Sequence, residues 1–381
     1  MDIQRLSQLV YDAGIVGAGG AGFPTHKKLT EGIRQIVVNA AECEPLMMVD
    51  HHILATHFRS SMDTLEKLIE ILGAEEAIIG IKGKNLHLLD AEIVRSLVGS
   101  RIRIREIPDV YPAGDEVVLV YETTGKIIPE GSVPVQVGVM VINTETLYNI
   151  HKAMHEHEPV TEKYVTIGGD IPKDVTVKVP VGMKISELLD GLGYIDLTEK
   201  AVINGGPMMG KLVDLERDVV TKTTKGLLIF PKTHSIIQRR LRPMSVTLKR
   251  AAAACCNCSM CTDVCPRHLL GHGIQVHKIL YAASHQRVLD PKNVLDSTLC
   301  CGCGVCTVMG CQQILDPQAI AMEAKRLLSK KGYRRTDASI IRSCAFLFMG
   351  KVMTSRMDSS PHSSMTIRSM PGAAPAWGGA P

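Results

Sequence analysis

Two cysteine runs near the C-terminal end constrain this 381-residue chain more than any other feature. The first run has the form Cys-x2-Cys-x2-Cys-x3-Cys-Pro, and the second has the form Cys-x2-Cys-x2-Cys-x4-Cys. Three thiolates at intervals of three residues wrap a short loop around one iron–sulfur cube, while the fourth thiolate reaches the neighbouring cube. The spacing therefore predicts two [4Fe–4S] clusters with crossed ligation. One cluster takes Cys255, Cys258, Cys261 and Cys311, and the other takes Cys265, Cys300, Cys303 and Cys306.

Zinc sites and disulfides are the alternatives to this interpretation. A structural zinc site uses four ligands in two pairs, and a thiol redox site uses one pair, so both need fewer cysteines than these runs supply. Pro266 follows the fourth cysteine of the first run, as in bacterial ferredoxins. In the second run, Gln312 stands where a proline is expected. The remaining cysteines are expected to be small buried residues or to point away from the iron: Cys43, Cys256, Cys301 and Cys344.

The composition excludes several classes of protein. Hydrophobic residues make up 45% of the chain and charged residues 22%, which is ordinary for a soluble globular protein. An aromatic content of 4% and a net charge of +4 disfavour binding to nucleic acid. We expect no secretory signal and no membrane span, and the free thiols favour a reducing cytoplasm. Basic residues concentrate in 239–250, which is either a solvated linker or a docking patch for an acidic redox partner.

The pattern of apolar residues predicts three folded parts. In residues 1–158, short apolar runs alternate with longer helical patterns, which indicates an α/β domain with a largely parallel sheet. Residues 159–235 predict a small α+β domain of β-grasp type. Residues 236–345 carry both cysteine runs and are expected to form a helical domain like a bacterial ferredoxin with two clusters. Residues 346–381 are rich in Met, Ser, Pro, Ala and Gly and are predicted to be a disordered tail.

A glycine-rich segment, GAGGAGFPT at 17–25, is the main candidate for a cofactor loop. It satisfies G-x-G-x-x-G formally, but a dinucleotide loop leaves a buried strand and opens a helix. Here a helical pattern precedes the loop, and Pro24 follows it closely. Glycines let a backbone lie against a flat ring or a phosphate without obstruction by side chains. A flavin cradle therefore suits the segment better than a dinucleotide loop or a flexible surface turn.

Five segments together resemble a known family. They read GAGGAGFPTHKKL (17–29), VNAAECEP (38–45), YPAGDE (111–116), NTET (143–146) and GGPMMG (205–210). In order and spacing they are similar to the flavin-binding family that includes the NADH-oxidising subunit of respiratory complex I and RnfC, and most of all to PduS-type cobalamin reductases. The likeness runs from about residue 5 to about residue 335, so the tail from 345 onward resembles nothing in the family.

The resemblance implies FMN as the bound cofactor and NADH as the electron donor. It also implies that the middle domain is the family's SLBB module, with GGPMMG as its signature loop. Matching positions imply an FMN-binding set of Gly17, Gly19, Gly20, Gly22, Lys28, Asn39, Glu42 and Asn143. The nicotinamide nucleotide would contact Phe23, Glu44 and Glu116.

Taken alone, several of these residues have simpler interpretations. Lys28 could be an ordinary surface lysine, and Glu42 and Glu44 could be solvated turn residues. Asn143 could simply cap the helix that follows it. Ile142 replaces the first of two asparagines expected at the NTET segment, so one flavin hydrogen bond could be absent.

The implied function is electron transfer from NADH through FMN and two clusters to a one-electron acceptor, which the resemblance gives as cobalamin. No side chain is expected to act as a catalytic acid, base or nucleophile. The alternatives are an RnfC-like component of an electron-transport complex and an iron–sulfur carrier with a degraded flavin site. The resemblance also implies a location inside a bacterial microcompartment, with a shell or redox protein as partner. The amphipathic face of residues 3–10 could be an encapsulation signal, but we expect it to pack as the first helix of the flavin domain.

Overall fold

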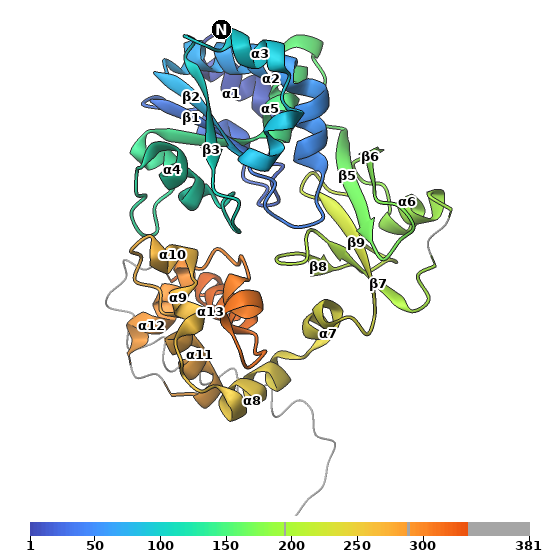
Figure 1. The fold of residues 1–381 in the computed structure, drawn as a ribbon, viewed down its shortest axis with the longest axis vertical. Helices are drawn as coiled ribbons and strands as arrows, with labels where there is room; N and C mark the ends of the chain where they lie inside the picture. Colours follow the sequence, from blue (N-terminus) through green and yellow to red (C-terminus); the bar gives the residue numbers. More distant parts are fainter. Residues whose placement is uncertain (194–195, 288–289, 334–381) are drawn as a thin grey trace, which may run out of the picture.

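The computed structural model describes residues 1–193, 196–287 and 290–333. Figure 1 shows a sheet with helices at the N-terminal end, a second sheet beside it and a group of helices carrying the cysteine runs. Within the described ranges, no helix is long and apolar enough to cross a membrane. The predicted disordered tail and Cys344 lie outside the described residues.

The first sheet confirms the predicted parallel arrangement. Its strands are β1 (Gln35–Ala40), β2 (Glu76–Lys82), β3 (Ile102–Ile107) and β4 (Val139–Asn143). They lie in the order β3-β2-β1-β4, and all the pairings are parallel. The central strands are nearly continuous runs of valine, isoleucine and alanine, because helices bury both faces of a parallel sheet.

Alternate residues of β1 face opposite helical layers. Ile36 and Val38 pack in one apolar core with α1 (Ile3–Asp12), α2 (Val49–Leu72), α3 (Ala91–Ser96) and α5 (Thr144–His151). Val37 packs in the core on the other face, with α4 (Glu116–Thr124). The amphipathic face of residues 3–10 therefore lies in the core of the first domain, as expected, with Leu6 and Val10 fully buried.

The second sheet has mixed topology. Its first two strands form an antiparallel hairpin, a helix follows, and the last long strand returns parallel to the first. Its strand order is β6-β5-β9-β7-β8. The elements are β5 (Glu162–Gly169), β6 (Val175–Pro180), α6 (Ile185–Gly191), β7 (Lys200–Asn204), β8 (Lys211–Leu212) and β9 (Gly226–Pro231).

The C-terminal part is helical, as predicted. Its longer helices are α7 (Ser235–Leu241), α8 (Met244–Ala254), α11 (Val276–His285) and α13 (Pro317–Lys330). The short helices α9 (Met260–Asp263), α10 (Pro266–Leu269) and α12 (Pro291–Leu295) lie between them in sequence. Helix α11 packs against α8 and α13 in an apolar core that also includes several cysteines of both runs.

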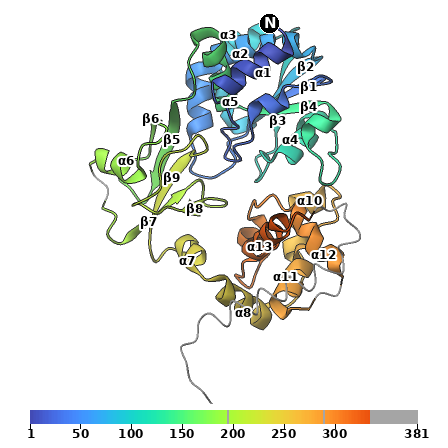
Figure 2. The same cartoon turned by 180° about the vertical axis from the view of Figure 1, so that it is seen from behind.

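Contacts between parts far apart in sequence join the helical part to the first sheet. The hydroxyl of Tyr111 donates a hydrogen bond to the carbonyl of Cys303 at 2.7 Å. The Nη2 atom of Arg267, in α10, lies 2.9 Å from Oδ2 of Asp115, which also caps α4. Figures 1 and 2 show α10 next to α4 from both sides. The YPAGDE segment therefore lies at the junction with the second cysteine run.

The helical part also contacts the second sheet, through the GGPMMG segment. Arg240 donates to the carbonyls of Pro207 and Gly210, each at 2.7 Å. Arg240 is thus occupied inside the molecule, and the proposed docking patch at 239–250 is wrong for this residue. Lys249 and Arg250 are exposed.

We predict that Arg267→Gln loosens the junction between α4 and α10. The substitution removes the charged partner of Asp115, whose side chain is 13% exposed. Leaving a nearly buried carboxylate without its partner costs about 1–3 kcal/mol. Hydrogen exchange read by mass spectrometry should show faster exchange in peptides that cover 111–118 and 265–270. Arg217→Gln removes an ion pair of an 84% exposed arginine and serves as the control. Unchanged exchange at both peptides would contradict the prediction.

Candidate functional site

The carboxyl-terminal edge of the first sheet is where a ligand site is expected. The chain passes from β1 to β2 on one side, while β4 lies on the other side of β1. Ligands of open parallel sheets bind outside the carboxyl ends of the strands at such a switch point. Glu42 follows β1 and Asn143 ends β4, so two of the predicted flavin-binding residues lie at this edge.

The glycine loop lies over the first turn of α5. The backbone amide of Ala18 donates to Oγ1 of Thr146 at 2.9 Å, and a Cβ atom placed on Gly19 would lie 3.8 Å from Cβ of Asn143. Gly20 has φ +109°, a conformation that glycine adopts without strain, and a Cβ there would meet nothing within 4 Å. The loop therefore presents an open stretch of backbone at the edge of the sheet. A flat cofactor such as FMN fits the loop at Gly20, where no side chain comes close, whereas at Gly22 the Thr223 methyl group would lie 2.8 Å from an added Cβ atom.

Three predicted ligand-binding residues meet beside this loop. Lys28 Nζ lies 2.7 Å from Oε1 of Glu116 and donates to the carbonyl of Val141 at 3.0 Å. The same ammonium group lies 5.5 Å from the ring centre of Phe23, which is 43% exposed. The side chain of Lys28 is only 14% exposed, so the interpretation of Lys28 as an ordinary surface lysine is wrong.

Glu42 belongs to a buried group of charges rather than to a solvated turn. Its Oε1 lies 2.9 Å from Nζ of Lys225, and its Oε2 accepts from the backbone amide of Asp50 at 2.5 Å. Burial, followed by the charge of Asp50, raises the pKa of Glu42 to about 7, although Lys225 opposes the shift. Sequence analysis missed Asp50 and Lys225, because nothing local distinguishes them from other charged residues at the start of a helix or just before a strand.

The two predicted asparagines are held by the protein itself. Asn39 donates to the carbonyl of Gly114 at 2.8 Å. Asn143 Oδ1 accepts from the amide of Glu145 at 3.0 Å, so this residue caps α5, and its Nδ2 donates to Asp50. The helix-cap interpretation of Asn143 is therefore confirmed, and its contact with a flavin stays a prediction. Ile142 is buried in the core of the first sheet.

Glu44 contacts the second sheet. Its carboxylate accepts from the backbone amides of Met208 at 3.1 Å and Met209 at 2.8 Å. A Cβ on Gly206 would clash with Oε2 of Glu44, so only glycine allows this approach. Burial raises the pKa of Glu44. The interpretation of Glu44 as a solvated turn residue is wrong, because the carboxylate holds the GGPMMG segment against the first sheet.

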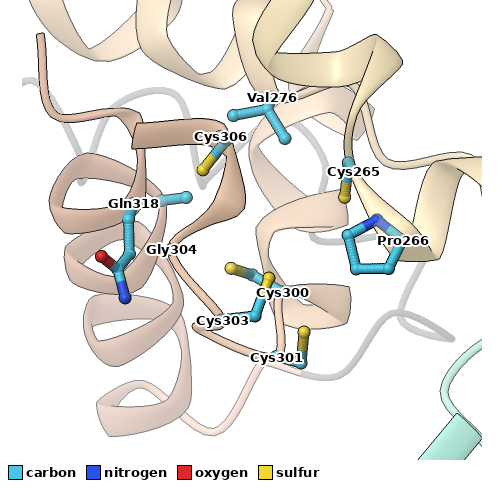
Figure 3. A pocket seen from close by; sticks show the side chains of 10 residues that line it. Cys265, Pro266, Val276, Cys300, Cys301, Cys303, Gly304, Cys306 and Gln318 are labelled. Carbon is cyan, nitrogen blue, oxygen red and sulfur yellow. The ribbon is translucent and has the colours of Figure 1, made fainter. Parts of the chain in front are cut away.

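The structure places Cys265 of the first run beside the second run, as crossed ligation requires, while the two ligand sets stay a prediction. Figure 3 shows Cys265 of the first run beside Cys300, Cys303 and Cys306 of the second, around a small space. Three members of the other predicted set, Cys255, Cys261 and Cys311, belong to one apolar core. A Cβ atom placed on Gly310, the neighbour of Cys311, would lie 3.1 Å from Cα of Cys261. Four sulfur donors per set would be the ligand set of a [4Fe–4S] cube.

Cys301 differs from expectation. It lines the same space as Cys265, and its thiol is hydrogen-bonded to that of Cys303, so it does not point away from the second set. Cys256 is exposed. Cys43 is half-buried and accepts from the amide of Gly114 at 2.7 Å. Among the residues with described positions, no group of three or more His, Cys, Asp or Glu side chains forms a site for a metal ion. The thiols of Figure 3 instead surround a shared space.

Comparison with known proteins identifies a family for the flavin-binding part and for the part with the cysteine runs. The Nuo51 FMN-binding domain matches residues 10–152, and the 4Fe-4S dicluster domain matches residues 254–316. The chain is 38% identical over 333 residues to cobalamin reductase PduS of Citrobacter freundii, covering 87% of this chain and 73% of that protein. It is 37% identical over 334 residues to cobalamin reductase PduS of Salmonella typhimurium, covering 88% and 74%. The chain belongs to the PduS family.

More distant relatives share the same framework. The chain is 31% identical over 274 residues to a component of the Na(+)-translocating ferredoxin:NAD(+) oxidoreductase complex of Acetobacterium woodii, covering 71% of this chain and 59% of that component. The crystal structure of an NAD+-reducing [NiFe]-hydrogenase in the H2-reduced state matches with a TM-score of 0.56 at 17% identity, covering 98% and 70% of the two chains. The second likeness shows a shared fold.

We predict that Cys265→Ala damages the cluster held mainly by the second run. The crossed sets leave that cluster with three thiolates, while the set of Cys255, Cys258, Cys261 and Cys311 stays complete. Electron paramagnetic resonance of the reduced protein should match Cys303→Ala and differ from Cys258→Ala. Cys256→Ala is the control, because this exposed residue belongs to neither set. A spectrum that matches Cys258→Ala would overturn the crossed assignment.

We also predict that the carboxyl group of Glu42 titrates near neutral pH. Its pKa of about 7 lies above the ordinary value of 4.5, so the folded state binds a proton more tightly than the unfolded state. The unfavourable contribution of this residue to stability therefore grows as the pH rises from 4.5 to 7 and is constant above that range. Infrared difference spectra of wild type and Glu42→Gln should show a protonated carboxyl band that disappears with a midpoint near pH 7. A band already absent at pH 5 would contradict the prediction.

Proposed function

We propose that this chain oxidises NADH and passes the electrons one at a time, through FMN and two [4Fe–4S] clusters, to cobalamin. The chain is an oxidoreductase of the PduS family with an FMN-binding domain and an iron–sulfur domain. The observation that carries the proposal is the hydrogen bond from Tyr111 to the carbonyl of Cys303. It joins the first sheet directly to the backbone of a predicted cluster ligand, so the two redox regions are in contact within one chain.

The need for both kinds of redox group follows from the donor and the acceptor. NADH releases two electrons together as a hydride, and iron–sulfur clusters accept one at a time; a bound flavin can do both. The protein has to hold the groups and exclude water, and no side chain has to act as an acid or a base. The glycine loop and Lys28 would hold FMN, and Phe23 and Glu116 would contact the nicotinamide nucleotide. Glu44 would share in that contact from its position against GGPMMG.

The two predicted thiol sets differ in their contacts and exposure, and this suggests an order of transfer. The set of Figure 3 includes Cys303, which contacts Tyr111, and Cys265, which lies next to Arg267 and its partner Asp115. The other set includes Cys258, which is exposed, beside the exposed Cys256. Electrons would therefore enter at the set with Cys265 and leave through the set with Cys258, where an acceptor can approach.

Further assignments belong to the same proposal. The four segments 1–158, 159–235, 236–345 and 346–381 would be an FMN domain, an SLBB domain, a cluster domain and a tail. Cobalamin is the acceptor because the relatives that match most of this chain are cobalamin reductases. A location in the cytoplasm, inside a microcompartment, stays a prediction from the sequence resemblance. The second candidate is an RnfC-like role in an electron-transport complex, which the likeness to the oxidoreductase complex of Acetobacterium woodii supports.

Protein purified without oxygen tests the proposal. We expect one FMN and about eight irons per chain, a visible spectrum that NADH bleaches, and reduction of cobalamin at a rate that depends on NADH. Cys303→Ala should keep the bleaching of FMN by NADH and lose the reduction of cobalamin, because the path is cut between the two. Clusters without FMN would favour an electron carrier. Reduction of ferredoxin but not of cobalamin would favour the RnfC-like role. Zinc or disulfides at the cysteine runs would overturn both candidates.

A further inference from the structure

A lysine of the second sheet reaches the edge of the first sheet. Lys225 comes immediately before β9, and its Nζ lies 2.6 Å from Oδ2 of Asp50 and 2.9 Å from Oε1 of Glu42. The two carboxylate side chains are each 2% exposed, and that of Lys225 is 13% exposed. One cation therefore sits between two buried carboxylates at the carboxyl-terminal edge of β1.

The contacts continue from Asp50 to the helix under the glycine loop. Asp50 Oδ1 accepts from Oγ1 of Thr144 at 2.8 Å and from Nδ2 of Asn143 at 3.0 Å. These residues are the cap and the first residue of α5. Two residues further on, Thr146 accepts from the amide of Ala18 in the glycine loop at 2.9 Å. A continuous series of contacts thus runs from β9 of the second sheet, through the start of α5, to the glycine loop.

The series depends on charge. Burial alone would raise the pKa of Asp50, but the charge and hydrogen bond of Lys225, together with Thr144 and Asn143, lower it below the ordinary value. The carboxylate therefore stays ionised and accepts from several donors at once. Without the lysine, two carboxylates would be buried side by side with no cation between them. Buried charges that lose their partner are strongly destabilising, so the group would take up a proton or rearrange.

We propose that Lys225 is a positioning residue of the flavin site, which is complete only when the second sheet is docked against the first. Through Asp50, the lysine fixes the start of α5, and α5 in turn holds the glycine loop open toward the cofactor. This inference rests on the proposed function in one respect, which is that FMN binds along the glycine loop. It explains why the second sheet is present beside a sheet that already carries the glycine loop.

The test compares FMN binding by the full chain, with its clusters intact and its flavin removed, in wild type and Lys225→Met. Loss of a residue that orients metal ligands typically weakens metal binding by about 10–100-fold. By analogy, we expect the dissociation constant for FMN to rise by about tenfold. Lys225→Arg keeps the cation and should restore most of the affinity. Lys232→Met is the matched control, because this lysine lies just beyond the other end of β9 and its Nζ donates to the carbonyl of Thr198, far from the carboxylates of Glu42 and Asp50 in sequence.

Two further measurements separate positioning from a general loss of stability. Hydrogen exchange in Lys225→Met should rise in peptides that cover 17–22 and 143–148. The midpoint potential of the bound flavin should become more negative, because a cation has been removed beside two carboxylates. Should Lys225→Met fail to fold, Lys225→Arg and Asp50→Asn provide the same comparison with smaller changes in volume: Asp50→Asn should weaken FMN binding while Lys225→Arg retains it.

The outcomes distinguish this inference from the proposed function. Wild-type protein that binds no FMN would overturn the proposed function and this inference with it. Wild-type protein that binds FMN, with Lys225→Met binding equally well at an unchanged flavin potential, would overturn this inference alone. Faster exchange confined to the second sheet would also overturn it, because the effect would not have reached the glycine loop.

Discussion

The ion pairs of Lys225 with Glu42 and Asp50 are the interaction on which the arrangement of this protein depends. Two carboxylates at the end of a parallel sheet are far from solvent, and such charges persist in a protein interior only when they are paired and hydrogen-bonded. The partner comes from a different sheet. The cost of leaving the carboxylates unpaired therefore favours one relative placement of the two sheets, and that placement also puts Glu44 against the GGPMMG segment.

A second set of contacts places the thiols relative to the same edge. Tyr111 and Asp115 belong to one short segment after β3, and they contact Cys303 and Arg267 in the helical part. Each contact is modest by itself, but both come from a segment that also packs beneath Asn39 through Gly114. The glycine loop, the edge of the sheet and the thiols of Figure 3 are therefore joined through a few short hydrogen-bonded steps. In an electron-transfer protein, these contacts would hold the proposed flavin site and the proposed cluster site close to each other.

The features that local sequence could predict are those with a regular repeat. The parallel strands follow from short apolar runs between helical patterns, and the crossed cysteine sets follow from the short reach of three closely spaced thiols. Sequence analysis failed where a side chain has a partner in another domain. Arg240 was grouped with a surface patch, yet it binds the carbonyls of Pro207 and Gly210. These partners lie 33 and 30 residues away from Arg240 in the chain, so spacing alone does not reveal them.

By itself, the sequence determined which chemical groups this protein can hold. The number and spacing of the cysteines specify thiolate ligands, and the four glycines specify an uncovered backbone, because both properties depend on residues that are neighbours in the chain. Only the tertiary structure decided how the groups are supported. Lys225 lies 175 residues from Asp50, and Met209 lies 165 residues from Glu44. Burial in the folded protein makes the charges of Lys225, Asp50 and Glu44 depend on partners elsewhere in the fold, because a charge removed from water has to be paired or hydrogen-bonded.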